Sequence, residues 1–236
     1  MATVNSGAST GRPVTIHLSA SAVTMDSPLV FDASTRASEV WLIGDGTTLQ
    51  AGWRRRLAQQ MSAPLLTVSL GAPRVHVRGL VLQGQVVVSG GELFLDNCTF
   101  AGSNVADDGG ALKLLAGSLH ATAVTFFGCA ARRGGAVYVM GGDARFLRCI
   151  FTGNMASEAG GGGAICVEGG SVVLEEKTHL RGNTAYDTSN SIRLEQGGTL
   201  TYKLPAPLGH YINSLGQPTL QLDAGAYADY PLACSA

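Results

Sequence analysis

The residues best suited to chemistry are acidic and lie at equivalent places along the chain. Asp107-Asp108 is an adjacent acidic pair, and alignment on the Gly-Gly motif that follows it places Asp107 beside Arg132 and, two segments later, beside Asp187. Glu158 falls in the longer loop between them. Clustered carboxylates can cleave polysaccharides by acid–base chemistry or bind Ca²⁺. An acid–base–acid order along one edge also fits ion pairs between neighbouring segments, and we favour this structural interpretation.

A second candidate group consists of Lys113, Tyr138 and Arg193, which occupy one column of outward-facing strand positions. A tyrosine flanked by cations can stack on a sugar ring or hold an anionic glycan. Outward positions must be filled by polar or amphipathic residues even without a ligand, so the column fits either a glycan-contacting face or an ordinary outer surface. The neighbouring outward column, which includes Phe94 and His120, is more apolar than a free surface requires.

The remaining reactive side chains form no metal or nucleophile motif. The five histidines are scattered, without the spacing of a zinc site. We therefore expect no metal and no cofactor. Asn97-Cys98-Thr99 is the single N-glycosylation sequon, and it applies only if the protein is secreted.

An internal repeat predicts how these residues are positioned. Gly109-Gly110-Ala111-Leu112 recurs at 134–137 and 162–165 and degrades to Ser-Asn-Ser-Ile at 189–192. The second residues of the four copies are 110, 135, 163 and 190, so the steps are 25, 28 and 27 residues. Two further sets keep this period, glycines and large apolar residues: Gly91, Gly117, Gly142, Gly170 and Gly198, and Phe100, Phe126, Phe151 and Leu180. Such a period is typical of solenoids.

Between these markers, apolar and polar residues alternate as in short strands. Short strands separated by glycine corners every ~26 residues predict an all-β fold, a right-handed parallel β-helix of roughly seven to nine coils. The predicted core positions are large and apolar: Phe100, Leu112, Leu114, Phe126, Val137, Val139, Phe151, Ile165, Val167, Ile192 and Leu194. Earlier strands are expected at 14–18, 40–43, 65–68, 75–77 and 86–88, with an inserted loop at 51–63.

The cysteines are not expected to pair within the repeats. Cys98 and Cys149 fall two coils apart, about 9.6 Å at the usual strand spacing. A disulfide requires Cα atoms within ~7 Å. Cys129 occupies a corner, and Cys166 is predicted on the outward side of its strand. Cys234 is a candidate for pairing outside this domain.

The Gly-Gly-Ala-Ile and Phe-x-x-Asn motifs within 109–192 resemble the repeats of the chlamydial polymorphic outer-membrane proteins, whose passenger domains are right-handed parallel β-helices. The chain departs from the pattern at Ser103, at Cys129 and at 189–191. The ends, at 30–46, 202–212 and 227–236, resemble β-helix domains in large surface-type proteins of unicellular algae, which usually continue into cysteine-rich tails. These resemblances imply an extracellular or cell-surface setting and a longer chain or assembly, but no activity.

We therefore divide the chain into an N-terminal lead-in at 1–13, a parallel β-helix at 14–204, and a C-terminal cap or tail at 205–236. A net charge of −1 excludes phosphate-driven nucleic-acid binding. No apolar run reaches the ~18 residues of a membrane span. The start of the sequence lacks the pattern of a secretory signal peptide.

For function, we expect a non-enzymatic surface or adhesion module that serves as a rigid scaffold or contacts a glycan. One alternative is a polysaccharide-cleaving lyase or glycoside hydrolase that uses the Asp107/Asp108 corner. A further alternative is a structural subunit of a larger assembly. The expected partner is accordingly a polysaccharide, another glycan or another surface protein.

Overall fold

The computed structural model describes residues 2–4, 11–52, 63–186 and 188–203, together with the backbone of four short strands within 210–233. In the described part of the chain, all regular elements are β-strands. Hydrogen bonds join 19 of them into one continuous sheet that wraps into a parallel β-solenoid of about seven turns with coils of about 26 residues. The predicted parallel β-helix is thus confirmed.

Each coil contributes one strand to each of three faces, and some long strands bend from one face to the next. Face A is built from β2 (Val14–Leu18), the first halves of β5 (Glu39–Ala51) and β7 (Arg74–Gln83), the second halves of β8 (Val86–Asp96), β10 (Leu112–Thr122), β17 (Ile165–Glu175) and β21 (Ile192–Lys203), and β14 (Asp143–Leu147).

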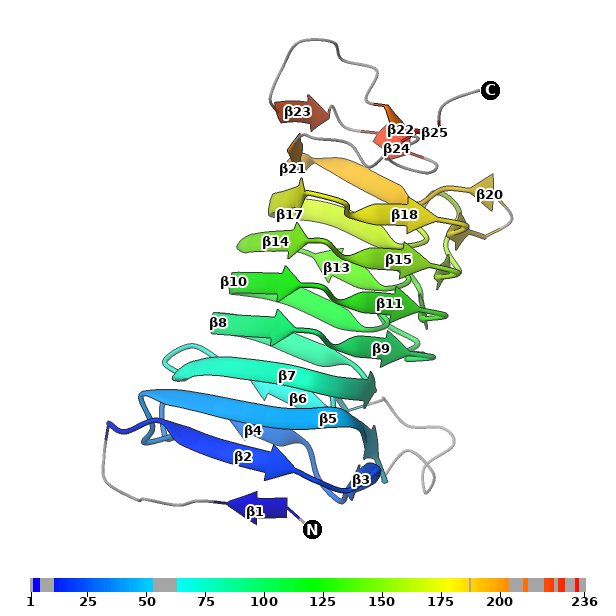
Figure 1. The fold of residues 1–236 in the computed structure, drawn as a ribbon. Coiled ribbons are helices and arrows are strands. Elements are labelled where there is room, and N and C mark those ends of the chain that lie inside the picture. Colours follow the sequence, from blue (N-terminus) through cyan, green and yellow to red (C-terminus); the bar gives the residue numbers. More distant parts are fainter. Residues whose placement is uncertain are drawn as a thin grey trace.

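Face B is built from β3 (Ala22–Met25), the second halves of β5 and β7, β9 (Thr99–Ala101), β11 (Thr125–Phe127), β15 (Ile150–Thr152) and β18 (His179–Arg181). Face C is built from β4 (Leu29–Phe31), β6 (Leu66–Val68), β13 (Val137–Val139) and the first halves of β8, β10, β17 and β21. Faces A and B are turned toward the viewer in Figure 1, and face C lies behind them.

Short strands complete one corner and both ends of the solenoid. β12 (Ala130–Ala131), β16 (Met155–Ala156) and β19 (Thr184–Ala185) stack in parallel, and β20 (Thr188–Ser189) pairs with β19 antiparallel. At the N-terminal end β1 (Ala2–Val4) pairs antiparallel with β2. At the other end β23 (Thr219–Leu222) and β24 (Gly225–Tyr227) pair antiparallel with β21, and β22 (His210–Tyr211) pairs with β25 (Leu232–Ala233) (Figure 1).

The core consists of inward side chains stacked from coil to coil. Phe100, Phe126 and Phe151 form a column of nearly parallel rings, with centroids 5.2 and 4.5 Å apart. Phe146 meets the last two edge-on at 6.0 and 5.3 Å. All eleven predicted core residues are buried. The alternation in the sequence therefore predicted the interior correctly.

The two glycines of each Gly-Gly corner have different tasks. Gly109 has a φ of +72°, a left-handed conformation that other residues resist. At Gly110 a Cβ atom would lie 2.2 Å from the carbonyl oxygen of Gly135 in the next coil. The first glycine therefore makes the turn, and the second allows neighbouring backbones to approach closely.

The Phe-x-x-Asn motif supplies a buried polar column between the coils. Asn154 Nδ2 donates to the Phe126 carbonyl at 3.0 Å, and Asn154 Oδ1 accepts from the Cys129 N–H at 2.9 Å. Asn183 repeats this role, because its Oδ1 accepts from the Asn154 N–H at 3.0 Å. Where the motif lacks Asn, the hydroxyl of Ser103 bonds the backbone of the preceding coil. This column satisfies backbone groups that would otherwise be buried without partners.

Several expectations lie partly outside the described residues. Most of the inserted loop, at 53–62, is among them, as are Asp187, Cys234 and much of the region after Lys203. The boundaries of the lead-in and of the C-terminal cap therefore stay predictions.

Candidate functional site

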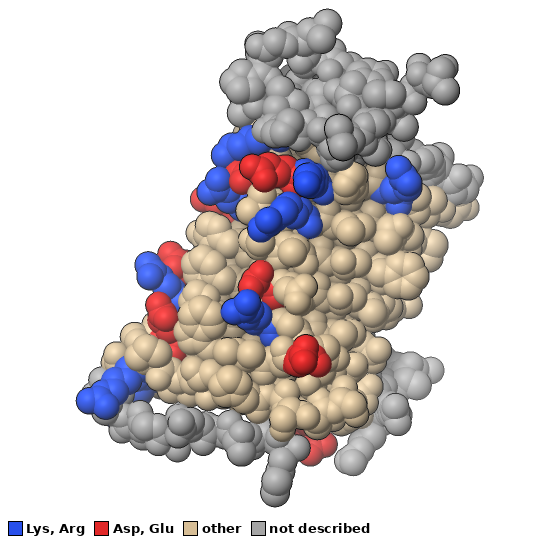
Figure 2. Space-filling model, viewed as in Figure 1, with Lys and Arg blue, Asp and Glu red and all other residues tan. Residues whose placement is uncertain are grey.

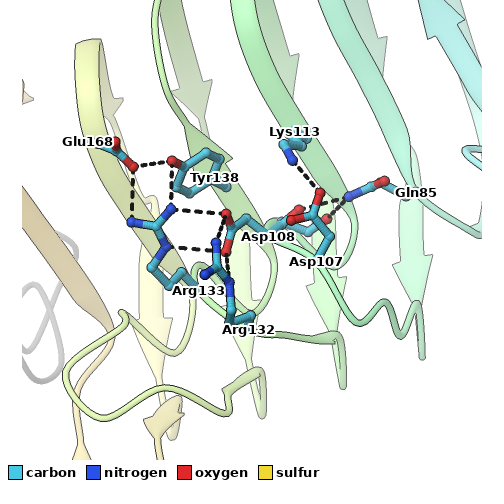
Figure 3. Close-up of polar contacts among 9 residues, drawn as sticks. Gln85, Asp107, Asp108, Lys113, Arg132, Arg133, Tyr138 and Glu168 are labelled. Carbon is cyan, nitrogen blue, oxygen red and sulfur yellow. Dashed lines mark hydrogen bonds and ion pairs between the residues drawn. The ribbon is translucent and has the colours of Figure 1, made fainter. Parts of the chain in front are cut away.

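The acidic corner contains a buried carboxylate held by two arginines. Asp108 precedes the first Gly-Gly corner and is only 3% exposed. In the next coil, Arg132 donates to it through Nε and Nη2 at 3.1 and 2.8 Å, and Arg133 does so at 3.2 and 3.0 Å (Figure 3). Burial alone would raise the pKa of Asp108, but the two guanidinium groups outweigh it and hold the pKa below its usual value.

The network continues from Arg133 to the following coil. Arg133 donates to the hydroxyl of Tyr138 at 3.0 Å and pairs with Glu168 at 3.0 Å. The Tyr138 hydroxyl in turn donates to the Glu168 carboxylate. Burial and the bond to Glu168 raise the pKa of Tyr138, so this hydroxyl stays a proton donor. On the opposite side, Gln85 Nε2 donates to the carbonyls of Asp108 and Gly109 at 2.8 and 2.6 Å.

We call this set the corner network: Gln85, Asp107, Asp108, Lys113, Arg132, Arg133, Tyr138 and Glu168 (Figure 3). Asp107 is 62% exposed and pairs with Lys113. Asp107 lies beside Arg132 as expected, since the Arg132 N–H donates to the Asp107 carbonyl at 2.9 Å. The expected ion pair is wrong by one residue, because the side chain of Arg132 reaches Asp108. The cause is that successive residues at the corner point in different directions.

Of the other predicted acidic residues, Glu158 does not contact this carboxylate. Glu158 is exposed, and its N–H donates to the Arg132 carbonyl at 3.0 Å. Asp187 lies outside the described residues. Gln85, Arg133 and Glu168 were not singled out from the sequence. Arg133 could have been, since it lies 25 residues after Asp108, the same step that separates Gly110 from Gly135.

The predicted glycan-contacting column is in register, but its tyrosine is covered. Lys113, Tyr138, Cys166 and Arg193 are successive partners in face C. Tyr138 is only 2% exposed, and the Arg133 guanidinium lies 4.9 Å from its ring centroid. Arg193 pairs with Glu195 at 2.8 Å. The expectation of an exposed ring is therefore wrong, because the corner network folds over it.

The described cysteines are buried and unpaired. Cys98, Cys129, Cys149 and Cys166 are free thiols. Cys166 occupies the predicted outward position of its strand, in register with Tyr138 and Arg193, and is nevertheless fully buried. Burial raises the pKa of Cys98 to about 11 and that of Cys149 to about 12. Thiols that stay protonated are poor nucleophiles and poor metal ligands.

Three shallow hollows lie along face A and its corner with face B. The largest, about 590 Å³, lies at that corner and includes Asp45, Arg78, Asn97 and Thr99 in its lining. The second, about 300 Å³, is lined by the rings of Trp41, His76, Phe94 and His120. The third, about 210 Å³, includes Arg145 and Glu175 in its lining. Asn97 is exposed, with a φ of +50° in the turn between the two faces. Its glycosylation stays a prediction.

The second hollow contains four stacked rings from successive coils. Trp41 and His76 have centroids 3.9 Å apart, His76 and Phe94 are 4.6 Å apart, and Phe94 and His120 are 4.8 Å apart. The interplanar angles are 11° or less. The sequence indicated only Phe94 and His120, because Trp41 and His76 lie in coils that break the 26-residue period.

Within the described residues, no group of three or more His, Cys, Asp or Glu side chains is arranged to hold a metal ion. The described part of the chain also contains no helix with the length and apolar character of a membrane span.

A known repeat coincides with one coil of this architecture. Residues 148–168 match the Chlamydia polymorphic membrane protein repeat. The resemblance is thus confirmed for this coil. The segment contains β15, β16 and the first four residues of β17, with Phe151, Asn154 and the third Gly-Gly corner. Neither a characterised protein nor a solved structure matches the chain.

Proposed function

We propose that this chain is a rigid, non-enzymatic β-helix module of a surface or adhesion-type protein. The Chlamydia polymorphic membrane protein repeat at 148–168 supports the surface setting. The uninterrupted stack of parallel coils supports a scaffold, since each coil is held by backbone bonds to the next.

The double ion pair of Asp108 is the observation that carries this proposal. The site of a typical glycoside hydrolase needs two carboxylates, one of them free to exchange a proton. The Asp108 carboxylate is occupied by four hydrogen bonds from Arg132 and Arg133. The lowered pKa of this carboxyl group also makes it a poor proton donor near neutral pH.

The hollows along face A also argue for the module. Each of the three is lined by one carboxylate, Asp45, Asp96 or Glu175. Asp96 pairs with Arg78 at 3.2 Å, and Glu175 pairs with Arg145 at 2.7 Å. Asp96 and Glu175 are each held by an arginine, which counts against their service as the acid and base of glycoside hydrolysis.

The corner network supports rigidity. It joins four successive coils through Gln85, Asp108, Arg133 and Glu168. Bidentate contacts between arginine and carboxylate fix geometry as well as charge. A linked series of such contacts would hold neighbouring coils in one register.

The test is incubation of the purified chain with neutral and acidic polysaccharides, with and without Ca²⁺, followed by assay for new reducing and unsaturated chain ends. We expect none. New ends that disappear in Asp108→Asn or Asp107→Asn would overturn the proposal and make the corner an active site.

An assembly subunit is the second candidate, and exposed apolar side chains favour it. Phe127 is 57% exposed on face B, and Ile150 and Met155 are exposed in the next coil. Sedimentation velocity over a range of concentrations tests this function. Self-association that Phe127→Ser removes would support it, and a monomer throughout would count against self-assembly.

A further inference from the structure

The second and third hollows form one groove along the outside of face A. Both are lined by His120 and Thr122, so they adjoin. Trp41, His76, Phe94 and His120 are successive register partners, and Arg145 is the next partner after His120. At ~4.8 Å per coil this row extends about 19 Å. The groove is thus elongated and parallel to the solenoid axis.

The rings present their edges, not their faces, to a ligand. Because neighbouring rings are nearly parallel and 3.9–4.8 Å apart, they cover one another's faces. Aromatic edges carry partial positive charge and attract oxygen atoms. Together with the Thr122 hydroxyl, they form a mostly apolar floor that also accommodates hydroxyl groups.

The charged side chains that line the groove are already paired. Arg78 pairs with Asp96 at 3.2 Å beside the rings, and beyond them Glu175 pairs with Arg145 at 2.7 Å and with Lys203 at 2.8 Å. An anionic ligand would be repelled by both carboxylates, and a cationic ligand would be repelled by both arginines. A hydroxyl group can donate to the carboxylate and accept from the guanidinium of the same pair. Figure 2 shows that the surface on this side is mostly uncharged and that most of its acidic and basic side chains lie next to one another.

The backbone of face A offers little to a peptide. In its central coils each strand is hydrogen-bonded to a strand on both sides, so no edge is open for an added strand. A chain of sugar rings needs no such edge. The length of one sugar ring is also close to the ~4.8 Å spacing of the coils.

We propose that this groove binds a neutral linear oligosaccharide laid along the solenoid axis. The inference rests on the proposed function, because it supplies a non-cleaving module with the face that contacts its ligand. It assigns the contact to Trp41, Phe94 and His120 in place of the covered Tyr138.

The experiment uses the full chain carrying Trp53→Phe, so that Trp41 is the remaining tryptophan. Its emission is followed during titration with hexasaccharides of β-1,4-glucose, β-1,3-glucose and β-1,4-mannose, and with an oligogalacturonate as charged probe. Phe94→Ala and His120→Ala test the groove. Phe127→Ala, which removes an exposed ring from face B, is the matched control. Thermal unfolding verifies that each variant is folded, and new chain ends are assayed in the same samples.

We expect saturable binding of at least one neutral hexasaccharide, no new ends, and a Kd raised about tenfold or more by Phe94→Ala and by His120→Ala. Phe127→Ala should change the Kd by less than about twofold. The inference is overturned if no neutral hexasaccharide binds, if only the oligogalacturonate binds, or if Phe127→Ala weakens binding as much as Phe94→Ala. Cleavage of a bound hexasaccharide would instead overturn the non-enzymatic function and leave the groove as its binding site.

Discussion

Asp108 and Arg133 lie one repeat apart and face each other across two adjacent coils, joined by hydrogen bonds of 3.2 and 3.0 Å. Because Arg133 also binds Tyr138 and Glu168, the pair links the register of one coil to that of the next two. A shift of one residue in either coil would separate a buried carboxylate from its counter-charges. The pair therefore specifies alignment as well as contributing to stability.

Substitution of Asp108 tests this role. Asp108→Asn removes the carboxylate partner of Arg132 and leaves Arg133 with Glu168 alone, and we expect it to lower the free energy of unfolding by about 2–3 kcal/mol. Asp107→Asn is the control, because Asp107 is exposed, and it should cost less than about 1 kcal/mol. Urea unfolding measures both. Equal decreases in the free energy of unfolding for the two variants would show that the buried ion pairs of Asp108 stabilise the fold no more than the exposed pair of Asp107.

Stability should decline in mild acid because of His76. Burial lowers the pKa of this imidazole below 6.5, and its Nε2 is buried without a hydrogen-bond partner. The nearby charged groups are Glu39, Arg74 and Glu92. The unfolded chain then binds a proton at a higher pH than the folded chain does. The neutral His76 therefore contributes fully to folding stability above about pH 6.5. This stability is lost as the pH falls through the pKa that His76 has in the folded chain, which lies below 6.5.

The measurement is urea unfolding at several pH values between 8 and 5, for the parent chain and for His76→Gln. The parent should lose more stability than the variant over this range. Identical pH profiles would mean that His76 titrates alike in the folded and unfolded chain.

The glycine corners predict a sharp contrast between two Gly→Ala variants. At Gly135 an added Cβ would lie 2.2 Å from the Gly163 carbonyl oxygen, and we expect Gly135→Ala to cost about 3 kcal/mol or more. Gly128 has a φ of +60° but no atom within 4 Å of an added Cβ. Gly128→Ala should then cost only the left-handed penalty, about 1–2 kcal/mol. Chemical denaturation measures the free energy of unfolding of both variants. A larger decrease for Gly128→Ala than for Gly135→Ala would contradict the close stacking of the corners.

The phenylalanine column provides a separate test of the core. Phe151→Ala should lower the free energy of unfolding by about 3–5 kcal/mol, since the ring is fully buried between coils. Phe127→Ala removes the same side chain from the surface and should change stability by less than about 0.5 kcal/mol. Similar values for the two variants would argue against the register of face B.

Asn97 should accept a glycan when the chain is secreted from a eukaryotic host. The residue is exposed in a turn, and the hollow of about 590 Å³ beside it leaves space for the first sugar. The predicted result is a mass decrease on treatment with an N-glycosidase, which Asn97→Gln abolishes. A secreted chain whose mass equals that of the unmodified polypeptide would show that Asn97 is not glycosylated.

The sequence predicted the regular coils well because their signals are local. Alternation identified inward residues such as Leu112 and Val139, and the glycine pairs marked corners whose backbones touch. Side-chain pairing across coils was harder to predict. A corner turns between Asp107 and Asp108, so alignment of residue numbers alone selected the wrong partner for Arg132.

The ring stack was missed for a different reason. Val75 lies 35 residues after its partner Val40 and only 18 residues before its partner Leu93. These steps depart from the common period, so Trp41 and His76 could not be aligned with Phe94 from spacing. Hydrogen bonding between strands tolerates such loops, because it depends on where a strand begins and not on the length of chain before it.

The direction of the strands has a mechanical consequence. The strands run across the long axis, so the hydrogen bonds between coils run along it (Figure 1). A force that pulls the two ends apart would act on the interfaces between coils in series, so that each interface carries the full force. The weakest interface would then set the tensile strength of the whole rod, and ties that cross several interfaces, such as the one through Asp108 and Arg133, would reinforce the places where they occur.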